Sequence, residues 1–188
     1  IRFLAQGLPE DSAALYRNYE LEVQAAIDQT VLCDQTYTEQ QHQLNFNDSP
    51  RNWAERMLHA DQMASFLDHP YYPTARAKFG MDTSELKAYS PEFNPTFELA
   101  WFAVPASEFE STGTEPVWWP TLAQVGLPQS LCTTHTLLPV HPMMRAAIAQ
   151  GIPESIEAPH TYLSVKPTLS VRTVAVLNHP ASHLKLPM

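Results

Sequence analysis

The stretch Thr96-Phe97-Glu98-Leu99-Ala100-Trp101-Phe102-Ala103-Val104 lies between Pro95 and Pro105 and consists almost wholly of apolar and aromatic residues. Its length suits a strand, and it is much shorter than the ~20 apolar residues that a membrane span needs. Proline at both ends favours a strand that stops sharply on each side. We therefore predict a buried strand at residues 96–104.

Two helices are predicted before this strand. Ser12 can cap the first, whose apolar residues recur every four positions and predict one buried stripe: Leu15, Tyr19, Val23 and Ile27. Asp48 or Ser49 can cap the second, with Pro50 in its first turn. Its predicted apolar face holds Trp53, Met57, Ala60, Ala64 and Leu67, and His69-Pro70 ends it.

The chain after the strand is rich in further strand patterns. Residues 106–120 predict a surface connection whose Trp118-Trp119 pair packs back on the core. Strands are predicted at Thr134–Val140, Tyr162–Val165, Leu169–Leu177 and His183–Leu186, and a short helix at Pro142–Gln150 with Gly151 as its left-handed cap. Helices first and an antiparallel sheet second predict an α+β fold. We expect the chain to be truncated, because the final strand would otherwise leave an unpaired edge.

Net charge limits the kinds of partner that the chain can bind, and its cysteines bear on its cellular location. Eleven basic and twenty acidic residues give a net charge of −9, which disfavours nucleic acid and anionic membranes as partners. An anionic small molecule would need a local group of basic residues, and Arg76, Lys78, Arg172 and Lys185 are the candidates. Two cysteines, Cys33 and Cys132, without Cys-x-x-Cys spacing favour reduced free thiols in a cytoplasm, with a single long-range disulfide as the alternative. Residues 1–7 contain neither an initiator Met nor the apolar core of a secretion signal, so we expect the true amino terminus to be missing.

Ser170-Val171-Arg172-Thr173 and Lys185-Leu186-Pro187 bring together groups that suit a polyphosphate. Arginine offers a planar fork, lysine a point charge, and the hydroxyls further donors. Strand alternation places Ser170 and Arg172 on one face and Thr173 on the other. A four-residue loop between the two strands puts Lys185 on the Ser170 and Arg172 face, whereas a five-residue loop pairs it with Thr173.

A histidine metal site is not indicated, although eight histidines are present. His179 and His183 are four apart, but Pro180 between them argues against one helical face, and no glutamate completes a zinc motif. His135 and His141 lack a nearby carboxylate in the sequence. We predict turn or surface histidines and no metal ligands in this chain.

Four ordered pieces carry a resemblance to a known family: residues 68–80 with His69-Pro70, Arg76 and Lys78; residues 89–93; Pro139-Val140-His141-Pro142; and the Ser170 to Lys185 segment. Together they resemble the amino-terminal part of the NRPS-independent siderophore synthetases, the aerobactin-synthetase-like (IucA/IucC) family. Tyr72 stands where the family usually has a second histidine, and Met143-Met144 where relatives often have Trp-Gln.

The resemblance implies a helical thumb at residues 1–105 and the start of a strand-rich, ATP-binding fingers region at residues 106–188, with the palm absent. It implies siderophore biosynthesis for iron acquisition. ATP with Mg²⁺ would activate citrate or a related polycarboxylate as an acyl-adenylate, which an amine or hydroxyl then captures. This portion would be inactive alone, and a homodimer is compatible with the family. The alternative is a non-catalytic binding or assembly module that keeps part of the fold.

Site residues are implied by the same resemblance. Ser170, Arg172, Thr173 and Lys185 would contact the nucleotide, and Arg172 and Lys185 would stabilise charge on the phosphates. The earlier segment supplies three further nucleotide-binding candidates, His69, Arg76 and Lys78.

Overall fold

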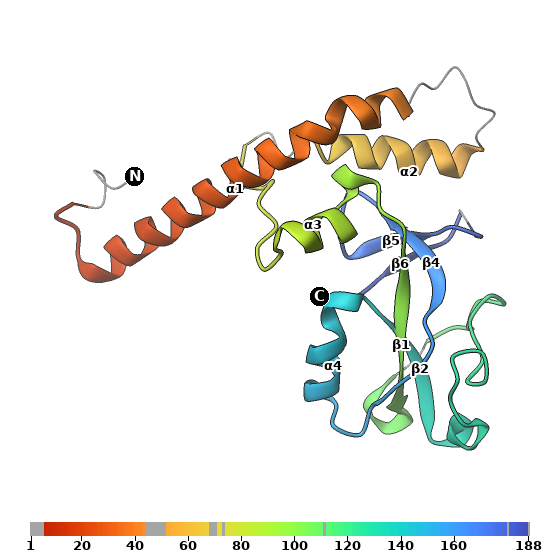
Figure 1. Ribbon diagram of the computed structural model, residues 1–188. Helices are drawn as coiled ribbons and strands as arrows, with labels where there is room; N and C mark the ends of the chain where they lie inside the picture. The colour runs from red at the N-terminus through yellow and green to blue at the C-terminus, as the bar shows by residue number, and fades with distance from the viewer. Residues whose placement is uncertain are drawn as a thin grey trace. The chain divides into compact units, whose positions relative to one another are not determined.

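The computed structural model describes residues 6–43, 52–67, 71–72, 74–110, 112–179 and 181–187 (Figure 1). Helices come first and an antiparallel sheet second, which confirms the predicted α+β fold. The chain forms two compact units, Ile1–Pro95 and Thr96–Met188. The predicted division after residue 105 therefore differs from the observed one, because the strand at Phe97–Pro105 pairs with three strands of the second unit.

The first unit consists of helices α1 (Glu10–Gln43), α2 (Trp53–Ala64) and α3 (Thr83–Tyr89) and the 3₁₀ turn η1 (Pro91–Phe93). Asn52 caps α2 by accepting a 2.9 Å hydrogen bond from the Glu55 backbone N–H, and the Glu55 carboxylate accepts from the Asn52 N–H in return. Asp82 and Glu85 form the same reciprocal cap on α3. The predicted caps at residues 48 and 49, Pro50 and the His69-Pro70 stop lie outside the described residues.

The buried stripe predicted on α1 is wrong. Leu15 and Ile27 are 70% and 52% exposed. From Ala26 onward, the buried residues of the helix recur every seven positions: Ala26, Cys33 and Gln40. Each four-residue step overshoots a helical turn by about 40°, so such a row drifts around the helix. A seven-residue step falls short by only about 20° and stays on one side.

The apolar face predicted for α2 is also wrong. Trp53 is 76% exposed and Met57 44%, whereas His59 and Gln62 are buried. The Gln62 amide donates a 3.1 Å hydrogen bond to the Asn94 side chain next to η1. The covered side of this helix therefore carries polar residues, where the sequence pattern predicts apolar ones.

An antiparallel sheet of strands of unequal length forms the second unit, in the order β2-β1-β4-β5-β6, and the short strand β3 also pairs with β1, outside this path. Its strands are β1 (Phe97–Pro105), β2 (His135–Val140), β3 (Ile156–Glu157), β4 (Tyr162–Pro167), β5 (Thr173–Val176) and β6 (His183–Lys185). Short 3₁₀ turns lie at η2 (Ala106–Glu108), η3 (Gln129–Thr133) and η4 (Pro142–Met144), and helix α4 spans Arg145–Gly151.

The central strand β1 is buried on both faces, as its sequence predicts. Leu99, Trp101 and Ala103 face one part of the core, and Phe102 and Val104 face another. The second group packs against Ile148 of α4 and against Met144 and Ile152, which flank this helix. Trp118 and Trp119 pack against the first group, which confirms the prediction for the aromatic pair.

One glycine prediction in the second unit is wrong. Gly151 is the last residue of α4, and its φ is not positive, so it is no left-handed cap. Gly126 does have φ of +80°, and a Cβ there would lie 2.7 Å from side-chain atoms of Pro159 and His160. The close approach, rather than a helix end, requires glycine in this unit.

None of the helices in the described ranges combines the length and the apolar character that crossing a membrane requires.

Candidate functional site

Ser170 and Arg172 lie in a tight hairpin loop, not on the strand that the sequence predicts, because β5 begins only at Thr173. The Thr173 N–H donates to the Ser170 carbonyl at 3.0 Å, and the Thr168 N–H donates to the Thr173 carbonyl at 2.9 Å. The Thr168 hydroxyl donates to the same carbonyl at 2.9 Å. These bonds close the loop, so the side-chain alternation of a strand does not include Ser170 and Arg172.

The observed register decides between the two loop lengths. Lys185 lies directly opposite Thr173, and the Leu186 N–H donates a 2.7 Å hydrogen bond to the Arg172 carbonyl. This is the pairing of the five-residue loop, so Lys185 shares a face of the sheet with Thr173. The backbone thus holds Arg172 and Lys185 at adjoining positions, and both side chains are exposed.

Lys185 lines a pocket of about 280 Å³ in the second unit. Edge strands β2 and β6 both contribute to it, so the sheet curls until its two ends border one cavity. The segment from Phe109 to Trp119 supplies the remaining wall. Among the described residues that line this pocket, Lys185 is the one basic group, and Ser170, Arg172 and Thr173 are not among them.

The two nucleotide-binding candidates of the first unit that the structure describes, Arg76 and Lys78, are held in ion pairs. The Arg76 guanidinium lies 3.0 Å from the Asp34 carboxylate, and the Lys78 ammonium lies 2.5 Å from Glu92 Oε1. Glu92 is 1% exposed, and its second oxygen accepts a 2.5 Å hydrogen bond from Ser90. Arg76 and Lys78 would have to leave these partners to bind a nucleotide. His69 lies outside the described residues.

Glu92 is the residue of this cluster that sequence reasoning missed. It is carried by the Tyr89–Phe93 segment, but nothing in its spacing links it to Lys78, fourteen positions earlier. Burial of the thiol, and to a smaller extent the Glu92 carboxylate, raise the pKa of Cys33 to about 11. The cluster therefore acts as an internal clamp between α1, η1 and the segment before α3.

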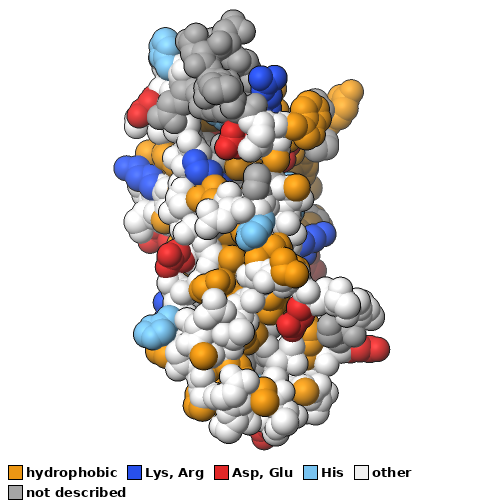
Figure 2. Space-filling model, turned by 90° about the vertical axis from the view of Figure 1, so that its right-hand side faces the viewer, with side chains coloured by type: hydrophobic (Ala, Val, Ile, Leu, Met, Phe, Trp, Pro, Cys, Tyr) orange, Lys and Arg blue, Asp and Glu red, His pale blue; other side chains and the backbone are white. Residues whose placement is uncertain are grey.

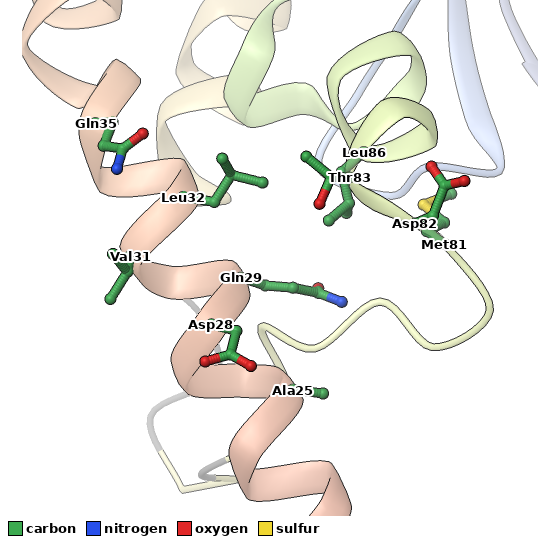
Figure 3. Close-up of a pocket in the computed structure, with 10 residues that line it drawn as sticks. All are labelled: Ala25, Asp28, Gln29, Val31, Leu32, Gln35, Met81, Asp82, Thr83 and Leu86. Atoms are coloured by element: carbon green, nitrogen blue, oxygen red, sulfur yellow. The ribbon is translucent and has the colours of Figure 1, made fainter.

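A larger pocket, of about 560 Å³, lies in the first unit between α1 and the start of α3 (Figure 3). Leu32 and Leu86 line it, and Asp28 and Asp82 supply its charged groups. The hydroxyl and backbone N–H of Ser84 and the backbone N–H of Glu85 hold the pKa of Asp82 below its usual range. No lysine or arginine is among the described lining residues, so this pocket does not suit a polyphosphate.

His141, in the Pro139–Pro142 segment, is fully buried. Its Nδ1 accepts a 3.3 Å hydrogen bond from the Met143 N–H, and its ring makes an edge contact with Phe97 at 5.1 Å between centroids. Burial lowers the pKa of His141 to about 4. The ring is therefore neutral at pH 7 and stabilises the turn that leads into α4.

Charge on the surface is dispersed. On the face in Figure 2, lysine and arginine side chains stand singly among hydrophobic and acidic ones. Across the described residues, no group of three or more His, Cys, Asp and Glu side chains is arranged to hold a metal ion. An anionic ligand would therefore depend on a local site such as the pocket that Lys185 lines.

A family model described as IucA / IucC family matches residues 56–188, which is well over half of the chain. The chain belongs to the IucA / IucC family. The match covers all of the second unit and the part of the first unit that holds the Lys78 and Glu92 pair. It confirms the resemblance seen in the sequence.

Solved structures share the fold at low identity. Aerobactin synthetase IucC from a hypervirulent pathotype of Klebsiella pneumoniae is 19% identical to this chain, with a TM-score of 0.59. The match covers 96% of this chain and 35% of the synthetase chain. The petrobactin biosynthesis protein AsbB from Bacillus anthracis str. Sterne is 14% identical, with a TM-score of 0.63, and the match covers 99% of this chain and 32% of AsbB. ATP-bound aerobactin synthetase IucA from the Klebsiella pathotype is 19% identical, with a TM-score of 0.55, and the match covers 89% of this chain and 31% of IucA.

The chain thus spans about a third of the length of these synthetases. Among curated proteins, none matches its sequence.

Proposed function

We propose that this chain is part of a siderophore synthetase that uses ATP to activate a citrate-like polycarboxylate and passes the acyl group to an amine or hydroxyl. Membership of the IucA / IucC family supports this function, and one structural neighbour was solved with ATP bound. The observation that carries the proposal is Lys185, which lines a pocket while its strand holds the Arg172 loop beside it.

The reaction needs positive charge at the phosphates. A carboxylate oxygen attacks the α-phosphorus of ATP, the bond to the β-phosphate oxygen breaks, and pyrophosphate leaves. The acyl carbon of the resulting adenylate is then attacked by the acceptor, and AMP leaves. Lys185 and Arg172 would stabilise the phosphate charge, with Ser170 and Thr173 as hydroxyl donors on the same hairpin.

Mg²⁺ would neutralise phosphate charge when bound with ATP. The described residues contain no carboxylate and histidine cluster suited to it, so we assign none of them as a ligand. Arg76 and Lys78 remain weaker candidates for the nucleotide, since each already has a carboxylate partner. The proposed location is the cytoplasm.

The test is citrate-dependent exchange of pyrophosphate into ATP by the full-length protein. We expect Lys185→Ala and Arg172→Ala to lower the exchange rate by about 100-fold, the usual cost of one group that stabilises transition-state charge. Lys87→Ala is the matched control, because Lys87 is also exposed but lies on α3 and lines neither pocket. Full exchange by both site variants would remove this hairpin from the mechanism.

A non-catalytic binding or assembly module is the second candidate. The Arg76–Asp34 and Lys78–Glu92 ion pairs favour it, because both basic side chains already make structural contacts. A full-length protein that neither binds ATP nor exchanges pyrophosphate would support the module and reject the synthetase.

A further inference from the structure

Helix α2 and the turn after it carry a row of apolar residues that faces solvent. The row follows the alternating four- and three-residue steps of a heptad pattern, and we call it the apolar seam: Trp53, Met57, Ala60, Ala64 and Leu67. Trp53 is 76% exposed, Met57 44% and Leu67 81%. Large apolar side chains that gather on an exposed surface are typical of a contact site for another protein.

The opposite side of α2 is the one that packs on the rest of the first unit. His59 and Gln62 are buried there, and the Gln62 amide donates to the Asn94 side chain. Just after the helix, the Phe66 ring packs edge-on against Tyr37 of α1 at 5.1 Å between centroids. These contacts anchor the helix, so the apolar seam is open to a partner.

One basic and one acidic residue border the apolar seam. Arg56 is exposed on one flank and Asp61 is half-buried on the other, at the g and e positions of the heptad in which Met57 and Ala64 occupy a. A separation of five residues turns the helix by about 500°, so these two side chains diverge by about 140° and do not meet within one helix. In two parallel helices joined through a and d, a g residue lies beside the e residue five positions later in the other helix. Arg56 of one copy would therefore meet Asp61 of a second copy.

The antiparallel orientation is disfavoured by charge. An antiparallel pair that overlaps the whole seam has its centre at Ala60, which sets Asp61 beside Asp61 of the other copy. Each copy carries a net charge of −9, so contact between copies needs opposite charges at the contact itself. The parallel orientation supplies them, because it sets each Arg56 against an acidic residue.

We propose that the apolar seam docks against the same seam of a second copy of this chain, as a parallel pair about a two-fold axis. The large side chains of the seam each meet their own counterpart and leave water, and Ala60 and Ala64 let the helices approach closely. Two symmetric contacts between Arg56 and Asp61 fix the register. The seam is only about two heptads long, so the interface is small and its dissociation constant lies in the micromolar range.

The first test measures self-association of the full-length protein by analytical ultracentrifugation between about 1 and 100 μM. Ala60→Glu sets two carboxylates against each other at the centre of the seam, and we expect it to raise the dissociation constant more than about tenfold. Arg56→Glu should raise it by about tenfold, since two attractive contacts become repulsive. Lys87→Glu, the same charge change at an exposed residue of α3, is the matched control and should stay within about twofold of wild type.

A charge exchange separates contact between copies from a fault in folding. Asp61→Lys alone should weaken association as Arg56→Glu does. An equal mixture of these two single variants should associate about as tightly as wild type, because each copy then offers the charge that its partner lacks. Since the variant residues lie on different chains, this recovery cannot come from a contact within one helix.

Cross-linking reads the orientation. In a Cys132→Ser background, which removes the exposed thiol, Met57→Cys and Ala64→Cys should each give a disulfide-linked dimer under mild oxidation. Parallel helices set each of these positions opposite itself, within reach of a disulfide. An antiparallel pair has one centre, so at most one of two positions seven residues apart can cross-link to itself.

Three results would overturn the proposal. A full-length protein that stays monomeric up to about 100 μM shows that no second copy covers the seam. A dimer that Ala60→Glu and Arg56→Glu leave unchanged is formed by another surface. Mixed single variants that associate no better than either one alone, or a cross-link at only one of the two cysteine positions, reject the parallel register.

Discussion

His141 makes the stability of the second unit depend on pH. The pKa of this histidine is about 4 in the folded protein, against 6.5 for the free side chain, because the ring is fully buried. A histidine whose folded pKa is lowered resists protonation until the chain unfolds. The contribution of His141 to the free energy of unfolding is therefore fully present above pH 6.5 and decreases as the pH drops from 6.5 towards 4. Below pH 4 this residue causes no further loss.

The magnitude follows from the two pKa values. The full difference corresponds to about 3 kcal/mol, since one pKa unit is worth about 1.4 kcal/mol. Between pH 7.5 and pH 5.0, linkage gives a loss of about 2 kcal/mol in the free energy of unfolding. This window also avoids Asp82, whose lowered pKa acts only under more acid conditions, and Cys33, whose raised pKa acts only in alkali.

Urea unfolding followed by tryptophan fluorescence measures this loss, because three of the four tryptophans lie in the second unit. His141→Asn keeps an oxygen that can accept from the Met143 N–H but cannot titrate, so we expect most of the pH slope to disappear. His183→Asn, on the exposed face of β6, should retain it. An unchanged slope in His141→Asn would refute the reasoning.

Three further outcomes are expected. Lys78→Met should lower the free energy of unfolding by about 3–5 kcal/mol, since it strands the buried Glu92 carboxylate, and Lys78→Met/Glu92→Gln should recover much of that loss in denaturant titrations. Asn52→Ala should cost about 1 kcal/mol by removing the cap of α2; an unaltered melting curve would contradict the observed capping box. A thiol reagent at pH 8 should modify exposed Cys132 quickly and Cys33 slowly, and equal rates would count against the burial that raises the Cys33 pKa.

Strand β1 was predictable because its burial on both faces leaves a continuous apolar run in the sequence. The stripe on α1 was not, because the helix buries small or polar residues such as Ala26 and Gln40 and leaves Leu15 exposed. Which side of a helix is covered depends on its neighbours in space, and the sequence pattern does not contain them.

The candidate site, too, could be predicted from the sequence only in part. The sequence identifies Lys185 and Arg172 by their chemistry, but their relative placement depends on the length of one hairpin loop, and both lengths fitted the pattern. The Ser170–Arg172 loop imitates strand alternation, and only its hydrogen bonds reveal a turn. Trp119 was expected to pack on the core, and its unsatisfied N–H could be found only once its surroundings were known.

Gln29 on α1 binds the main chain of Lys78 twice, accepting from its N–H at 2.7 Å and donating to its carbonyl at 3.2 Å. The contact uses only main-chain atoms of residue 78, so any residue except proline can provide it, but it depends on both halves of the Gln29 amide. Spontaneous deamidation to glutamate would remove the donor and set a negative charge against a carbonyl oxygen. Deamidation at this single amide would thus weaken one contact between the long helix and the segment before α3, while the Arg76–Asp34 ion pair would still join the two.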